Sequence, residues 1–258
     1  MEERHQAHWK DPDLPGGHGG DRAGATITCD RCVEIVVAGI LKKAAGARSK
    51  ITCESWTGIT VALGGRIDFT AIDLENADVA MNTTEGNGDT KLTDSGLLNS
   101  VRPFRVVPKS KLELVKVKAA MPAKVPDGVE SVAHVFWSLK ASHLDFDTGP
   151  GEGIMVKDSG EAVIEDSILK ANNPLDLVSA YKAKSLKLSY ATLTNAHCGP
   201  HMEGIDEFSI DHVTSENNIY GITIYGAGKG TISQCNMSGT SAWLDLQGDH
   251  GPVTFDNV

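Results

Sequence analysis

The chain of 258 residues has few aromatic residues (5%), no long hydrophobic run and no arginine after Arg105. A helix that spans a membrane needs about 18 to 20 consecutive apolar residues, and the most apolar segment, residues 33–41, is too short. Residues 1–24 are polar and histidine-containing, without the apolar core of a secretory signal peptide. The sequence therefore predicts no membrane span and no signal peptide, and we expect residues 1–25 to form a disordered polar tail.

The chain also lacks an excess of positive charge. Its formal net charge is -10 and its pI is about 5.3, so the phosphate backbone of a nucleic acid would be repelled. A neutral or cationic glycan is compatible with this charge, and an anionic glycan would need a bridging divalent cation such as calcium. Nothing else in the sequence indicates a cofactor.

The cysteines are few and odd in number, so at least one of the five is unpaired within the chain. Cys29 and Cys32 form one CxxC, and Cys53 follows 24 residues after Cys29. Because no fourth Cys or His lies at a suitable spacing for zinc, we predict no metal site there and favour a disulfide near the N-terminus of an exported protein. Cys198 is a candidate reactive thiol, and Cys235 is interpreted as a small core residue.

What the sequence does contain is a repeat. Short apolar triplets recur every 22 to 25 residues from Phe69 to the end of the chain. One residue from each repeat is expected to face inward: Phe69, Leu92, Leu114, Leu139, Ile164, Leu188, Ile210, Ile232 and Phe255. A repeat this short cannot bury an apolar face alone, and its period-two alternation predicts an all-β solenoid of about nine coils.

Two further patterns follow the same period. A second alternating strand begins about twelve residues after the first in the clearest coils, as in residues 153–156, 221–224 and 243–246. Seven residues beyond the inward position stand Asn76, Asn99, Asn195 and Asn217. Asparagine tolerates a left-handed backbone, so we interpret these residues as a ladder at a turn. The alternative is that they bind a sugar.

On these repeats, and on the entry pattern of residues 50–52, 56–61 and 64–65, the chain resembles the right-handed parallel β-helix proteins of the pectin-lyase-like superfamily. The resemblance covers residues 50–258 and implies a right-handed parallel β-helix at the cell surface or outside the cell. The period continues without a break, so we expect one domain over residues 26–258. Val258 ends one strand into a coil, which predicts a domain truncated at its C-terminal end or, alternatively, an uncapped end that associates with another molecule.

Polar residues on the second strand form the candidate site. We expect Met155, Asp176, His201, Thr223 and Asp245 to lie in one outward column, about 4.8 Å apart from coil to coil. Asp176, His201 and Asp245 are the candidate catalytic residues, since carboxylates and imidazoles serve as general acids and bases. The simpler interpretation is a solvated face, because an acidic solenoid carries Asp, Ser and Thr outward for solubility.

Longer coils place their extra residues on one side of the solenoid, where repeat proteins often bind ligands. We expect the insertions at residues 118–130, 147–153, 172–175 and 197–204. The candidate substrate-binding residues from these segments and from the second strand are Glu203, Thr223, Asp147, Asn172, His197 and Tyr220.

The sequence departs from the enzymes of the resembled superfamily. Lyases of that group use a basic residue, usually arginine, and the later coils contain no arginine. Hydrolases of that group use an Asp-Asp pair and a Gly-His-Gly; the chain has no Asp-Asp, and its Gly-His-Gly at residues 17–19 lies in the tail. We therefore predict a secreted or cell-surface protein that binds polysaccharide. The alternatives are a polysaccharide hydrolase or lyase and a structural or adhesive scaffold. We expect Trp56, Trp137 and Trp243 to flank the core.

Overall fold

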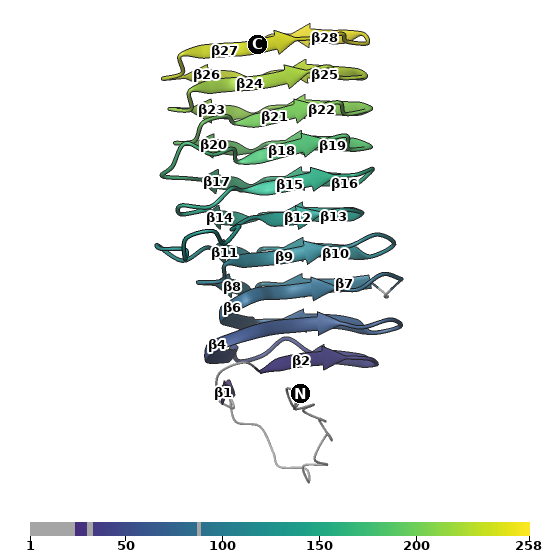
Figure 1. Ribbon diagram of the computed structural model, residues 1–258, viewed down its shortest axis with the longest axis vertical. Helices are drawn as coiled ribbons and strands as arrows, with labels where there is room; N and C mark the ends of the chain where they lie inside the picture. The colour runs from purple at the N-terminus through teal and green to yellow at the C-terminus, as the bar shows by residue number, and fades with distance from the viewer. Residues whose placement is uncertain (1–23, 30–32, 87–88) are drawn as a thin grey trace.

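The computed structural model describes residues 24–29, 33–86 and 89–258, and over these residues the chain is a right-handed parallel β-helix of about ten turns (Figure 1). The described residues form strands and turns and contain no helix. No helix in this part of the chain is therefore available to cross a membrane. The predicted tail lies in residues outside the described ranges, apart from Gly24 and Ala25.

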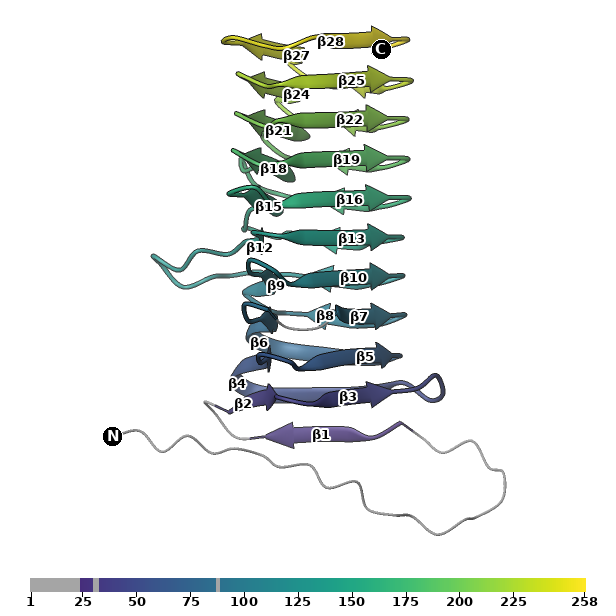
Figure 2. The same ribbon diagram turned by 90° about the vertical axis from the view of Figure 1, so that its right-hand side faces the viewer.

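Each turn contributes one strand to a ten-stranded parallel sheet, whose members lie one above another in Figure 2. These strands are β3 (Ile40–Lys43), β5 (Arg66–Thr70), β7 (Asp89–Thr93), β10 (Lys111–Val115), β13 (Ser138–Ser142), β16 (Glu161–Glu165), β19 (Ser185–Ser189), β22 (Glu207–Asp211), β25 (Lys229–Ser233) and β28 (Val253–Asp256).

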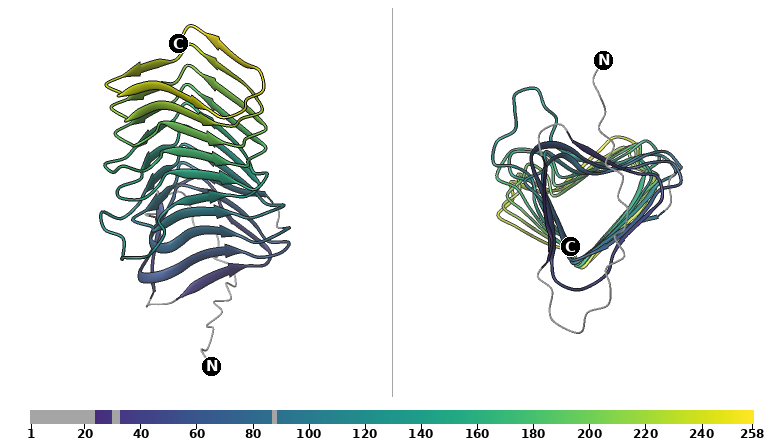
Figure 3. Two further views of the ribbon diagram at one scale, coloured as in Figure 1. Left: turned by 45° about the horizontal axis from the view of Figure 1, so that its top comes forward. Right: turned by 90° about the horizontal axis from the view of Figure 1, so that it is seen from below.

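The other strands form an eighteen-stranded sheet that covers the two remaining sides of the three-sided cross-section (Figure 3). One side consists of short strands: β1 (Thr26–Cys29), β8 (Gly96–Leu98), β11 (Lys118–Ala120), β14 (Asp145–Asp147), β17 (Ile168–Lys170), β20 (Thr192–Thr194), β23 (Thr214–Glu216) and β26 (Asn236–Ser238). The other consists of β2 (Glu34–Val37), β9 (Arg102–Val106), β12 (Ala133–Val135), β15 (Ile154–Lys157), β18 (Val178–Tyr181), β21 (Pro200–Glu203), β24 (Tyr220–Tyr225) and β27 (Ala242–Gln247). Two long strands, β4 (Ser49–Val61) and β6 (Ile72–Thr83), bend through both sides.

The register of the ten-stranded sheet confirms the predicted inward ladder except at one position. Leu188 pairs with Ile164 and Ile210, and all three are fully buried. Leu139 is buried but pairs with Leu112, and Ala141 occupies the ladder position opposite Leu114. The prediction was wrong there by two residues, because the long loop before β12 changes the spacing and the alternation leaves both residues facing inward.

The fold has one more turn than the nine predicted. The first strand of the ten-stranded sheet, β3, places Lys43 opposite Phe69. Lys43 Nζ donates to the backbone oxygen of Thr70 at 2.8 Å. Because the ladder position of this turn holds a charged residue, the apolar pattern in the sequence did not indicate the turn. Sequence analysis also missed the short strands of residues 96–98 and their successors, since a strand of three residues carries a single inward side chain.

A left-handed residue stands at the corner after each strand of the ten-stranded sheet, from β5 onward. It always lies two residues beyond the ladder position, with φ between 45° and 56°. The series is Ala71, Asp94, Lys116, His143, Asp166, Tyr190, His212, Gln234 and Asn257. This conformation costs a residue with a side chain about 1 to 2 kcal/mol, so its recurrence shows that the geometry of the coil, rather than residue preference, determines the corner.

The predicted asparagines occupy a second left-handed turn, after the short strands. Asn76, Asn99, Asn195 and Asn217 all have positive φ, and Gly239 continues the series. The Asn99 amide donates to Asn76 Oδ1 at 2.6 Å, and the Asn76 amide donates to Thr52 Oγ1 at 3.0 Å. The ladder is thus observed for the first pair, and the second pair shares its backbone conformation.

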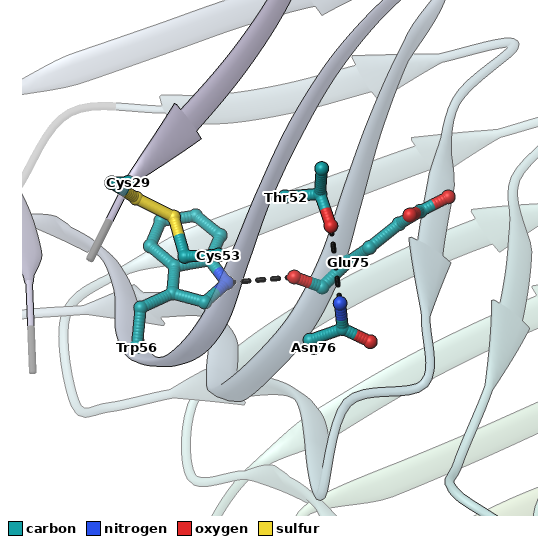
Figure 4. The surroundings of a disulfide bond; sticks show 6 residues. All are labelled: Cys29, Thr52, Cys53, Trp56, Glu75 and Asn76. Carbon is teal, nitrogen blue, oxygen red and sulfur yellow. Dashed lines mark hydrogen bonds between the residues drawn. A yellow bond between two sulfur atoms is a disulfide. The ribbon is translucent and has the colours of Figure 1, made fainter. Parts of the chain in front are cut away.

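A disulfide joins the first two described coils (Figure 4). Cys29 and Cys53 lie opposite each other on β1 and β4, with their Cα atoms 4.7 Å apart. The Trp56 indole, 2% exposed, packs beside the disulfide and donates from Nε1 to the Glu75 backbone oxygen at 2.7 Å. The predicted disulfide is therefore present, while Cys32 lies outside the described residues.

The tryptophans are placed differently from the prediction. Trp56 belongs to the core, but Trp243 is 68% exposed and Trp137 is 40% exposed. On β27, Trp243 alternates with Leu244, so the larger side chain faces outward while the leucine faces the interior. The prediction that Trp137 and Trp243 flank the core was wrong, because Trp243 occupies the outward position beside Leu244 and Trp137 lies in the connection between β12 and β13.

Substituting aspartate for Ile210 tests the interior register. Ile210 is fully buried between Leu188 and Ile232, so Ile210→Asp would bury an unpaired carboxylate and should cost at least about 3 kcal/mol or abolish soluble expression. The matched control is Thr231→Asp, an outward exposed position on the neighbouring strand. Urea unfolding of both variants is the measurement. Equal stability of the two would contradict the register.

Candidate binding face

The candidate site lies on the outward side of β18, β21, β24 and β27, which we call the outer face (Figure 1). In register, Ser179 lies opposite His201, His201 opposite Thr223, and Thr223 opposite Asp245. Met155 lies opposite Ser179 on the strand before, so the predicted column is present over four of its five residues. Asp176 is not a member, and Ser179 takes the place that the prediction gave it.

Asp176 belongs to a second column, at the turn that precedes these strands. It lies two residues before Val178, and Cys198 lies two residues before Pro200, the partner of Val178. Cys198 in turn forms a bridge with Tyr220 of the next coil. The insertion at residues 172–175 shifts the strand by three residues relative to the spacing assumed from the sequence, which explains the error.

Although it is out of register, Asp176 reaches His201. Its Oδ2 lies 2.6 Å from His201 Nδ1, and its Oδ1 accepts the Cys198 backbone N–H at 3.2 Å. Burial raises the pKa of Asp176. The hydrogen bonds from His201 and Cys198 together lower this pKa by more than burial raises it, so the net shift is downward. The carboxylate is thus held ionised beside an imidazole whose other nitrogen, Nε2, is buried without a hydrogen-bond partner.

Two tyrosine rings flank His201. Tyr181 and Tyr225 stand edge-on to the His201 ring, with centroids 5.5 Å and 5.4 Å away. The Tyr225 hydroxyl donates to Asp245 Oδ2 at 2.9 Å, which raises the pKa of Tyr225. Burial likewise raises the pKa of Tyr181. Both phenols are therefore neutral hydrogen-bond donors at physiological pH.

Cys198 lies beneath this layer. It is 1% exposed, and its Sγ is 3.3 Å from His197 Nδ1 and 3.4 Å from Thr223 Oγ1. Burial raises the pKa of Cys198 to about 12. A thiol that remains protonated is a poor nucleophile, so the structure does not support the reactive thiol considered from the sequence.

Asp176, His197 and Cys198 are also the described residues whose donor atoms could hold a metal ion, since one oxygen, one nitrogen and one sulfur lie within 4.8 Å of one another. His197 is the most accessible of the three, with 41% of its side chain exposed against 11% for Asp176. Its ring also contacts Tyr220, with centroids 5.2 Å apart.

The other predicted binding residues are spread more widely. Glu203 is exposed at the end of β21, on the same side as His201. Asp147 ends β14, and its Oδ2 lies 3.3 Å from Lys170 Nζ. Asn172 is exposed in the turn that follows β17. These last two residues lie after the short strands, at the corner before the outer face, and have no observed contact with the Asp176–His201 pair. Residues 200–203, predicted as an insertion, form strand β21.

Sequence analysis did not select Ser179, Tyr181 or Tyr225 for the site. All three follow from the observed register, since Ser179 pairs with His201 and Tyr181 and Tyr225 flank Glu203 on neighbouring strands. Tyr181 is the fourth residue of β18 and Tyr225 is the sixth residue of β24, and each stands opposite Glu203. Both could have been found by aligning residues 178–181 and 222–225 with residues 200–203. The insertion lengths conceal that alignment.

No family model, curated protein or solved structure matches the chain.

Glu152 supplies a test of electrostatics near the site. Burial raises the pKa of Glu152 above its ordinary value of 4.5, although Ser179 Oγ donates to its Oε1 at 2.8 Å. The folded protein holds this proton more tightly than the unfolded chain. The stabilisation that protonated Glu152 contributes is therefore fully present below pH 4.5, and it is lost as the pH rises through the pKa of Glu152 in the folded protein.

Glu152→Gln should consequently raise the thermal midpoint at neutral pH, by roughly 1 to 3 °C for a gain of up to about 1 kcal/mol, and leave it unchanged in acid. The amide oxygen can still accept from Ser179. Glu203→Gln, the same change at an exposed carboxylate, should shift the midpoint little at either pH. The assignment would be contradicted if the change in thermal midpoint caused by Glu152→Gln were less favourable at neutral pH than in acid.

Proposed function

We propose that the protein binds a polysaccharide along the outer face. The observation that carries the proposal is the combination of Trp243, 68% exposed on β27, with Asp245 two residues further on the same strand. Alternation places both side chains on the outward surface. A flat aromatic ring packs against the C–H face of a sugar, and a carboxylate accepts hydrogen bonds from its hydroxyl groups.

Further groups of both kinds extend this surface along the solenoid axis. Tyr225 is hydrogen-bonded to Asp245 on the next strand, and Glu203 lies opposite Tyr225 on the strand before it. Successive strands are about 4.8 Å apart, roughly the length of one sugar unit. A glycan chain that runs parallel to the axis would therefore meet a new side chain at each coil.

The charge of the protein favours a neutral or cationic glycan. The formal net charge of -10 and the carboxylates of Glu203 and Asp245 would repel a uronate polymer unless a divalent cation such as calcium bridged the two. We propose a neutral polysaccharide or cell-surface glycan as the ligand.

A hydrolase or lyase is the second candidate, and the Asp176–His201 hydrogen bond favours it. A carboxylate that orients an imidazole through Nδ1 is the arrangement of a general base. However, His201 Nε2 is buried, so a substrate could reach it only if neighbouring side chains moved aside. The geometry therefore supports binding better than catalysis, and a purely structural or adhesive scaffold remains the third candidate.

We also propose membership of the pectin-lyase-like superfamily and a location outside the cell. The first rests on the repeat pattern together with the right-handed parallel β-helix. The second is supported by the Cys29–Cys53 disulfide, since disulfides persist in oxidising compartments. Partly exposed apolar residues on β27 and β28, Leu246 and Phe255, are a surface through which coils of two molecules could associate end to end.

Glycan binding can be tested by affinity electrophoresis against a panel of neutral and uronate polysaccharides. Trp243→Ala and Asp245→Asn should each weaken binding at least about tenfold, a loss of about 1.4 kcal/mol. The matched controls are Trp137→Ala, an exposed tryptophan off the outer face, and Asp211→Asn, an outward aspartate of the ten-stranded sheet. Both controls should bind normally.

The proposal would be overturned if the unmodified protein bound no polysaccharide, or if the site variants and the control variants lost binding equally. Reducing-sugar and unsaturated-product assays on the retained polysaccharides separate the two candidates. If the protein turns over a polysaccharide and Asp176→Asn or His201→Ala abolishes this activity, the protein is an enzyme. Binding without turnover would support the binding protein.

A further inference from the structure

Three side chains of different chemistry converge at the turn before the outer face. Asp176 and Cys198 occupy equivalent positions on neighbouring coils, and His197 adjoins Cys198. His197 Nδ1 lies 3.4 Å from Asp176 Oδ1 and 3.3 Å from Cys198 Sγ. One imidazole nitrogen thus contacts both an oxygen and a sulfur, and all three atoms lie within 4.8 Å of one another.

The two distances from His197 Nδ1 are close to the edges of a tetrahedral zinc site. Zinc binds imidazole nitrogen and carboxylate oxygen at about 2.0 to 2.2 Å and thiolate sulfur at about 2.3 Å. A tetrahedral angle then places the nitrogen about 3.4 Å from the oxygen and about 3.6 Å from the sulfur. The observed distances of 3.4 Å and 3.3 Å need only small side-chain movements to meet these values.

The surroundings already orient the carboxylate as a metal ligand requires. Asp176 Oδ2 is engaged by His201 Nδ1 at 2.6 Å, which leaves Oδ1 directed toward His197 and Cys198. Hydrogen bonds of this kind from a second layer of residues typically fix the ligands of metal sites. His201 would therefore act as a positioning residue.

We propose that Asp176, His197 and Cys198 bind a divalent transition metal ion, with zinc the best fit to their donor set. Oxygen, nitrogen and sulfur ligands together favour zinc over calcium or magnesium, which prefer oxygen alone. The thiolate and the carboxylate would neutralise the two positive charges of the ion. This inference does not depend on the proposed glycan binding.

Binding of the ion would displace one proton. The Cys198 thiol gives up its proton to solvent as the sulfur–metal bond forms, and no oxidation or reduction takes place. The three protein ligands leave a fourth position for water, and the Thr223 hydroxyl, 3.4 Å from the sulfur, adjoins the ligand set. His197, with 41% of its side chain exposed, provides the side from which the ion enters.

Cobalt(II) titration of the purified protein, without thiol reductants, tests the proposal. Cobalt replaces zinc in such sites, and a cobalt–thiolate bond produces a charge-transfer band in the near ultraviolet. We expect this band to saturate at one cobalt per chain and to disappear when zinc is added. Histidines elsewhere in the chain, such as His5 and His8, can bind cobalt but cannot produce this band without a thiolate.

Variants assign the band to its ligands. Cys198→Ser should remove it, and Cys235→Ser, at the other free buried cysteine, should retain it. His197→Gln alters a partly exposed side chain and should weaken cobalt binding at least about tenfold, since loss of even a second-layer partner typically costs about 10- to 100-fold. Circular dichroism verifies that each variant is folded.

The absence of a charge-transfer band in the unmodified protein would overturn the proposal. So would a band that persists in Cys198→Ser, which would assign the thiolate to another cysteine, or undiminished cobalt affinity in His197→Gln. Should Cys198→Ser fail to fold, the His197→Gln titration decides alone. Glycan retention by the metal-free protein would leave the proposed function intact whatever the cobalt result, so the two proposals can fail independently.

Discussion

Stacking of coils through parallel backbone hydrogen bonds is the constraint on which the rest of the structure depends. No coil is closed by its own contacts, since each strand pairs with the equivalent strand of the coil before and after it. The constraint extends into the corners. Tyr190, His212 and Gln234 adopt a left-handed backbone, and their N–H groups donate to the carbonyl oxygens of Asp211, Ser233 and Asp256 in the next coil. The ladder thus compensates for an unfavourable conformation that is repeated in every turn from β5 onward.

The same constraint creates the candidate site. Residues about 22 positions apart in sequence become neighbours, so Asp176 meets Cys198, and His201 lies between Ser179 and Thr223. A largely buried aspartate, two histidines, a thiol and three tyrosines gather around one part of the solenoid, although no separate strand or domain is devoted to them. Only their placement at equivalent positions in consecutive coils brings them together, which is how a repeat protein can acquire a site by substitution alone.

The fold was predictable because its signal is repeated. Ile164, Leu188, Ile210 and Ile232 each predict the next, and an error at Leu139 does not propagate, since the following coils restore the register. The first coil was missed because Lys43 occupies the ladder position. The short strands were missed because three residues carry too little alternation.

The site was less predictable because it depends on loop lengths that vary from coil to coil. His201, Thr223 and Asp245 were correctly aligned because their coils have equal spacing. Asp176 precedes the strand that contains Ser179, and the spacing does not reveal where the insertion ends. The Asp176 side chain extends from the turn to contact His201. The repeat period predicts which residues lie opposite each other on the strands, but it does not predict a side-chain contact between residues that are out of register. The exposure of Trp243 was missed for a related reason, since adjacency to an inward strand does not decide which way the first residue faces.

The most direct test of the account is whether residues 176 and 198 are neighbours, because both the candidate face and the ligand set depend on that register. The native Cys29–Cys53 disulfide joins residues at matching positions of adjacent coils. The D176C variant should therefore form a disulfide with Cys198 on oxidation, identified by mass spectrometry of proteolytic peptides, while S179C, three residues further along, should not. Linkage of S179C but not D176C to Cys198 would show that the coils stack in a different register and would contradict the central claim.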